Sequence, residues 1–152
     1  MENNLWLDRM KDFRRSKGWD VDGKFPIMFF STINGYHHFR YRPESSHRLV
    51  CMRETNNTYD PRAIIVYDST NGHLVGRVPQ GLQSLIYDWI LNNNIARSSL
   101  FCTGEFQHDG QVQGGGPKLK CVYLLEFNTE NFHLPQVAQQ LHEVLQTNDL
   151  YM

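Results

Sequence analysis

A single stretch, Leu49–Pro79, most constrains the fold of this chain, because it alternates short apolar runs with turn-forming residues. The first run ends at Arg53-Glu54, the second covers Ala63–Tyr67, and the third closes on Gly76–Pro79. Asn71 and Gly72 separate the last two runs and fit a hairpin turn, since both residue types tolerate positive φ. The stretch therefore predicts three consecutive antiparallel strands.

The first turn of this stretch, Asn56–Asp60, is crowded with groups that form hydrogen bonds. Asn, Asp and Pro form turns for backbone reasons alone, so an Asx-type turn explains most of it. Tyr59 has two interpretations: it anchors the loop on the core, or it stacks on the ring of a ligand. Asp60 either caps the backbone of the next strand or accepts a hydrogen bond from a sugar hydroxyl. Sequence spacing does not choose between them.

Length and charge restrict the class of protein. A chain of 152 residues fits one domain with a sizeable core. The formal net charge of −1 excludes a protein that coats nucleic acid with a basic surface all around, but it allows a local basic patch. Three cysteines, Cys51, Cys102 and Cys121, lie in apolar runs without paired spacing, which favours buried, reduced thiols in an intracellular protein, nuclear or cytoplasmic. The N-terminus lacks the long apolar segment of a signal peptide or a membrane span.

The remaining elements follow from hydrophobic periodicity. Helical spacing recurs at both ends of the chain and after the hairpin, and continuous apolar runs mark further strands. We expect helices over Leu5–Ser16, Pro79–Asn92 and Leu134–Leu145, and strands over Phe25–Ile33, Ser99–Phe106 and Leu119–Phe127. A glycine-rich loop, 108–117, separates the last two strands.

This order, about six strands with two to three helices, predicts a mainly β fold: a small antiparallel barrel whose openings are covered by helices. We place an N-terminal helical extension and link at residues 1–24, the domain at 25–146 and a C-terminal tail at 147–152.

A run of aromatic and basic residues, Tyr36–Arg42, is unusual for a structural strand. On a strand, Tyr36, His38 and Arg40 share one face, and alternate residues share the other. Aromatic and basic groups together bind single strands by stacking and phosphate contact. The simpler interpretation is a barrel strand with solvated ends. Arg77, likewise, either clamps a phosphate or ends its strand in solvent.

Catalytic and metal signatures are not apparent. The acidic residues form no recognisable acid/base pair, and the triple glycine before Pro117 lacks the spacing of a phosphate loop or a dinucleotide fingerprint. His37 and His38 are adjacent and the cysteines are unpaired, so no ordered zinc ligand set appears. We therefore expect no catalytic residues, no metal and no cofactor.

Taken together, Gly35–Phe39, the run LVCMRETNNTYDPRAIIVY, then Gly72 and LVGRVP before an amphipathic helix resemble the HIRAN domain family. The resemblance covers about Ile27–Phe127, with Leu134–Leu145 as the last helix. It implies an OB-like barrel that holds the 3′ end of single-stranded DNA. A stand-alone domain of this kind acts by binding.

The resemblance also implies site residues. Tyr59 matches the tyrosine that packs the terminal base, Asp60 the acceptor of the 3′-hydroxyl, and Arg77 a basic phosphate contact. Phe106 corresponds to a later aromatic. An arginine and two aromatics follow the first glycine in the family, and their places here are filled by three residues in succession: His37, His38 and Phe39.

The departures from the family pattern keep a second function open. Stacking survives at His38 and Phe39, but the fixed positive charge is lost at His37 unless Arg40 or Arg42 supplies it. The alternative is a protein-interaction adaptor on the same scaffold, with a partner held by the groove or the N-terminal helix and without nucleic-acid binding. The residues do not separate DNA from RNA as ligand.

Overall fold

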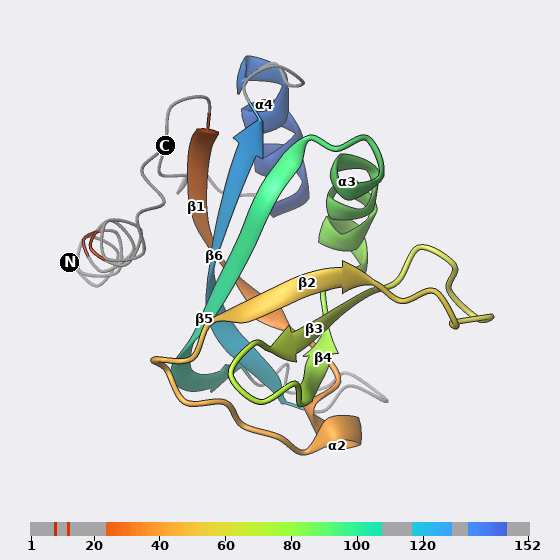
Figure 1. Cartoon of the computed structure of the whole chain (residues 1–152), viewed down its shortest axis with the longest axis vertical. Helices are drawn as coiled ribbons and strands as arrows, with labels where there is room; N and C mark the ends of the chain where they lie inside the picture. The colour runs from red at the N-terminus through yellow and green to blue at the C-terminus, as the bar shows by residue number, and fades with distance from the viewer. Residues whose placement is uncertain (1–7, 9–11, 13–23, 108–116, 129–133, 146–152) are drawn as a thin grey trace.

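The computed structural model describes residues 24–107, 117–128 and 134–145, together with Asp8 and Asp12. These residues form one six-stranded antiparallel sheet and three helices (Figure 1). The strand order is β1-β6-β5-β2-β3-β4, so the first and last strands of the sheet are both edges. The predicted N-terminal helix and the glycine-rich loop fall outside the described residues, apart from Asp8, Asp12 and Pro117.

The strands confirm the sequence pattern with one exception. Each predicted strand is present, and most extend by a residue or more at their ends. The bounds are β1 Lys24–Ile33, β2 Leu49–Arg53, β3 Ile64–Asp68, β4 Leu74–Arg77, β5 Ile95–Gln107 and β6 Lys118–Asn128. The exception is the run Tyr36–Arg42, which is not among those six strands: both interpretations of this run assumed a strand, and the structure has the short helix α2, Tyr36–Phe39, there.

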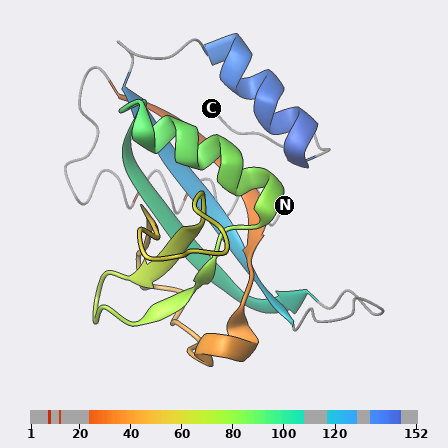
Figure 2. The ribbon, with the colours of Figure 1, turned by 90° about the vertical axis from the view of Figure 1, so that its right-hand side faces the viewer.

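Two longer helices cover one side of the sheet (Figure 2). Helix α3, Gln80–Leu91, follows β4 directly, and its apolar stripe buries Leu82, Ile86 and Trp89. Helix α4, Leu134–Leu145, packs against α3 and buries Val137 and Leu141. Both positions follow from the i, i+3, i+4 spacing of apolar residues. Among the described residues, no helix is long and apolar enough to cross a membrane.

The expected closed barrel is wrong in detail, because the sheet is open. Its two edges touch at one isolated bridge, Asn34 to Arg77, through backbone hydrogen bonds of 2.9 and 2.8 Å. Gly76 makes this approach possible, since a Cβ there would lie 2.2 Å from the carbonyl oxygen of Asn34. A continuous ladder between β1 and β4 would be needed to close a barrel. The result is a strongly curved sheet joined at a single point.

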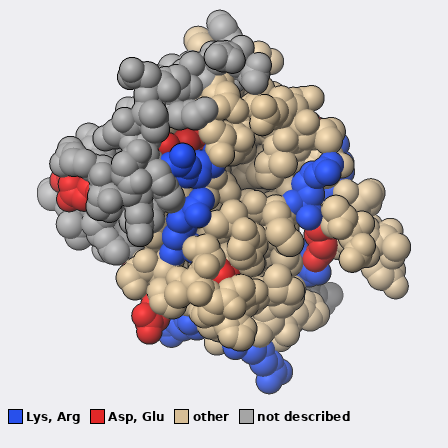
Figure 3. Space-filling model, in the orientation of Figure 1, with Lys and Arg blue, Asp and Glu red and all other residues tan. Residues whose placement is uncertain are grey.

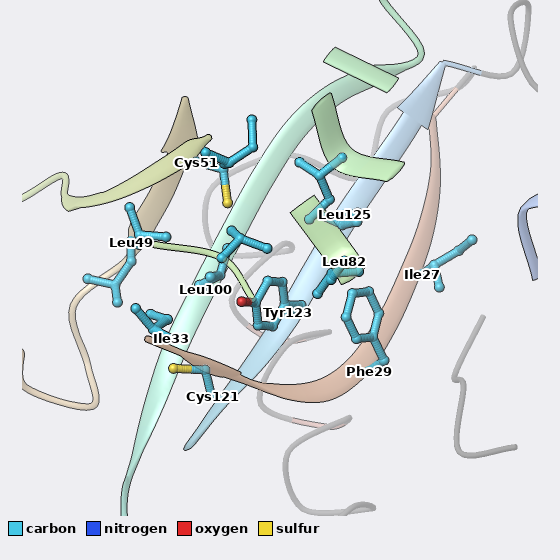
Figure 4. Close-up of a cluster of buried hydrophobic side chains, with 14 of the residues drawn as sticks. Ile27, Phe29, Ile33, Leu49, Cys51, Leu82, Leu100, Cys121, Tyr123 and Leu125 are labelled. Carbon is cyan, nitrogen blue, oxygen red and sulfur yellow. The ribbon is translucent and has the colours of Figure 1, made fainter. Parts of the chain in front are cut away.

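The main core lies between the curved sheet and the two longer helices (Figure 4). Alternate residues of the strands face it, as the period of two requires. Its side chains come from every strand and include Phe29, Leu49, Leu100, Tyr123 and Leu125, all fully buried.

All three cysteine thiols are buried, as predicted, and none forms a disulfide. Cys102 and Cys121 are cross-strand partners whose sulfur atoms lie 3.6 Å apart. Burial raises the pKa of the Cys51 thiol to about 12, and it also raises that of Cys121. The thiols therefore act as small apolar core groups.

Candidate nucleic-acid interface

The β2–β3 loop (residues 54–63) carries the central sequence motif, and its own side chains fix its shape. The side-chain oxygen of Asn57 accepts hydrogen bonds from the backbone N–H of Tyr59, at 2.9 Å, and of Asp60, at 2.8 Å. The side-chain amide of Asn57 donates to Glu54 at 2.6 Å. These bonds form the predicted Asx-type turn. Tyr59 does not anchor the loop, because its side chain is 99% exposed.

Asp60 fixes the second half of the loop. One carboxylate oxygen accepts the backbone N–H of Arg62 at 3.1 Å, and the other accepts the side-chain amide of Gln83 at 2.6 Å. Gln83 is buried in α3, so the loop is tied to that helix. A carboxylate offers about four lone-pair sites. Asp60 therefore keeps acceptor capacity beyond the two bonds that hold the loop.

Arg77 lies where the two sheet edges meet, and its guanidinium is already engaged. Nε and Nη2 donate to the two carboxylate oxygens of Glu54, both at 3.0 Å. The guanidinium also lies 5.4 Å from the ring centroid of Phe39. The hydrogen bond from Arg77 is the main cause that holds the pKa of Glu54 below its usual range. A bidentate phosphate contact would have to use the Nη1 side of the guanidinium.

Helix α2 takes the place of the strand that was assumed for Tyr36–Arg42. Gly35 has φ of +91° and turns the chain immediately after the Asn34 bridge, a conformation that favours glycine. One helical turn follows, and it ends at Arg40, whose φ is +51°. His37 and His38 are exposed, with ring centroids 4.1 Å apart, whereas Phe39 turns toward β4.

Phe106 lies at the other side of α2. Its ring packs edge-on against Tyr36, with centroids 5.0 Å apart, and the guanidinium of Arg42 lies 4.8 Å from its centre. Arg42 also donates a hydrogen bond to the carbonyl of Gly104. The predicted aromatic of the late strand is thus part of the α2 surroundings, but its ring face is covered by Arg42.

The segment after α2 is held by a buried carboxylate. Asp68, fully buried, accepts the hydroxyl of Tyr41 at 2.7 Å and the N–H of Thr70 at 2.9 Å, and it lies 2.8 Å from Nδ1 of His47. Burial raises the pKa of Asp68, but hydrogen bonds from Tyr41 and His47 outweigh that effect and hold it below its usual range. This network fixes the chain on which Arg40 and Arg42 lie.

The predicted site residues therefore fall into two adjoining groups. Tyr59 and Asp60 lie on the β2–β3 loop, which reaches Arg77 through Glu54. The second group is α2 with Arg40 and Phe106, and it joins the first where Phe39 meets Arg77. Figure 3 shows basic side chains beside the projecting loop, with acidic atoms among them.

Three residues that connect the site were missed by sequence reasoning. Glu54 was considered only as an acid without a partner, Asn57 was counted among the turn formers without its bond to Glu54, and Gln83 was not assigned a role. The signal for Glu54 and Asn57 was their place inside the polar run between two strands. The sequence carried no such signal for Gln83, because a polar residue in an amphipathic helix is expected to face solvent.

Comparison with known proteins agrees with this architecture. The family model of the HIRAN domain matches residues 28–108, just over half of the chain. The crystal structure of the HIRAN domain of human HLTF superposes with a TM-score of 0.61 at 18% identity, covering 80% of this chain and 93% of that one. No curated protein matches. The chain belongs to the HIRAN domain family.

Proposed function

We propose that this chain is a non-catalytic nucleic-acid-binding domain that holds the 3′-hydroxyl end of single-stranded DNA. The observation that carries the proposal is Tyr59, an aromatic ring 99% exposed on a loop whose backbone is fixed by hydrogen bonds. An exposed aromatic ring can stack a nucleic-acid base, which contributes about 1 to 3 kcal/mol per base. A pre-ordered loop also lowers the entropic cost of binding.

The groups near the Tyr59 ring support the end of a DNA strand as the ligand. Tyr59 stacks the terminal base, and Asp60, which keeps acceptor capacity, takes the terminal hydroxyl. The strand then runs over Arg77 toward α2. There Arg40 and His38 lie exposed, and neither Arg40 nor Arg42 has an ion pair with a carboxylate among the described residues. These arginines supply the positive charge that the family pattern places at His37.

A binding panel tests the proposal. Fluorescence anisotropy would compare oligonucleotides of one sequence that end in a 3′-hydroxyl or a 3′-phosphate, at two salt concentrations. We expect the phosphate to bind at least tenfold more weakly, because it brings a second negative charge to Asp60. Equal affinity for the two ends would refute end recognition. No oligonucleotide binding even at low salt would point instead to the protein-interaction adaptor. The affinity for RNA of the same sequence, compared with that for DNA, would show which sugar the domain prefers.

A further inference from the structure

A second basic surface lies on the other side of the β2–β3 loop. Arg53 and Glu54 are consecutive at the end of β2, so their side chains leave the strand in opposite directions. Glu54 binds Arg77 on the α2 side, whereas the guanidinium of Arg53 lies 5.7 Å from the ring centroid of Tyr87 in α3. The loop projects between α2 and α3 in both views (Figures 1 and 2).

Arg53 and Arg62 share the ring of Tyr87 but differ in their hydrogen bonds. Arg62 lies 4.5 Å from the ring centroid and donates to Asp88 at 2.6 Å and to the carbonyl of Ser84 at 3.1 Å. Arg53 is exposed, and within the described part of the chain its guanidinium faces the ring and makes no hydrogen bond or ion pair. Its N–H donors are therefore available, and the ring limits the conformations that it must give up on binding.

We propose that Arg53, positioned by Tyr87, binds the phosphodiester backbone of a second nucleic-acid strand that continues past the bound 3′ end. The inference rests on the proposed function. In the proposed complex, the 3′ end of the bound DNA strand lies at Asp60 and its backbone runs over Arg77 toward α2. All of its phosphates are then on the α2 side of the loop, and none reaches the α3 side. A guanidinium there can meet a phosphate only if another strand supplies it. The preferred ligand is thus a 3′ end that faces a continuing strand.

The test uses two DNA ligands that differ only beyond the end. In both, a 3′-hydroxyl strand is annealed to a complement, with its last nucleotides left unpaired by mismatches. In one ligand the complement stops at the mismatches, and in the other it continues as a single-stranded extension. We expect the natural protein to bind the extended ligand about threefold more tightly or better, because one added phosphate contact releases further counterions on binding.

Arg53→Gln is the deciding variant, and the 3′-hydroxyl single strand is its control ligand. We expect the variant to lose the gain from the extension and to keep its single-strand affinity within about twofold, with a salt slope on the extended ligand lower by about 0.7 to 0.9. Arg53→Lys, which keeps the charge, should retain part of the gain. Unchanged thermal melting would show that both variants fold.

Two results would overturn the inference while leaving end binding intact: equal affinity of the natural protein for both ligands, or a full gain in Arg53→Gln. Failure of the natural protein to bind the single strand at all would instead remove the proposed function on which the inference rests.

Discussion

The two groups of the candidate interface reach their shapes by different routes. The β2–β3 loop takes its turn from hydrogen bonds among its own residues, chiefly to the side chains of Asn57 and Asp60, and Gln83 of α3 then ties it to the domain. Helix α2 depends on distant residues, because the chain turns there only after Asn34 has met Arg77 across the two sheet edges. A short motif can therefore specify the loop, whereas α2 is specified by tertiary structure.

The largest effect should come from breaking the support of α2. Gly76→Ala places a Cβ where the carbonyl oxygen of Asn34 lies, so the bridge must open. We expect the free energy of unfolding to fall by about 3 kcal/mol or more, as for severe overpacking. Chemical denaturation measures it.

Gly81→Ala is the matched control, since a Cβ there meets only the side chain of Val144 at 3.6 Å and the site is helical. It should be neutral or stabilising by up to about 1 kcal/mol. Equal destabilisation by both substitutions would show that the bridge is not what makes Gly76 necessary.

Removing the exposed ring of the loop should separate binding from stability. Tyr59→Ala deletes a side chain that is 99% exposed, so stability should change by less than about 0.5 kcal/mol. Loss of base stacking should weaken single-strand binding by about 1 to 3 kcal/mol. Anisotropy and thermal melting measure the two quantities, and Tyr59→Phe, which keeps the ring, should bind nearly as well. Undiminished binding by Tyr59→Ala would contradict the proposed role.

The local support of the loop can be tested at Asn57. Asn57→Ala removes hydrogen bonds to two backbone amides and to Glu54, and we expect a loss of about 1 to 2 kcal/mol in stability. Asn56→Ala, at an exposed neighbouring position, should change stability by less than about 0.5 kcal/mol. Urea unfolding would compare them. Similar losses at both positions would mean that the loop is not held by Asn57.

The smallest effect should come from restoring the charge that α2 lacks. His37→Arg adds a fixed positive charge at an exposed position of the helix, and we expect single-strand affinity to rise about threefold with a steeper salt dependence. His73→Arg, on the exposed turn before β4, adds the same charge elsewhere. If it raises affinity equally, the gain is non-specific and α2 has no special part in binding.

Much of the fold was predictable because its elements carry strong periodic signals. Short apolar runs bounded by turn residues located the strands, and the stripe of Leu82, Ile86 and Trp89 located α3. Chemistry alone also predicted the turn at Asn57. The open sheet and α2 were not predictable, because Gly76 and Asn34 are far apart in sequence and only the fold shows that their backbones meet. For the same reason, Arg77 could be named as a site residue, but not its pairing with Glu54.

The three core thiols provide a built-in reporter of opening of the native state. A thiol with its pKa raised to about 12, as at Cys51, has almost no reactive thiolate at neutral pH, and burial also keeps reagents away. Because the cysteines lie on β2, β5 and β6, alkylation at each one reports when that strand becomes accessible. Coincident labelling rates at all three would mean that the curved sheet opens as one cooperative unit.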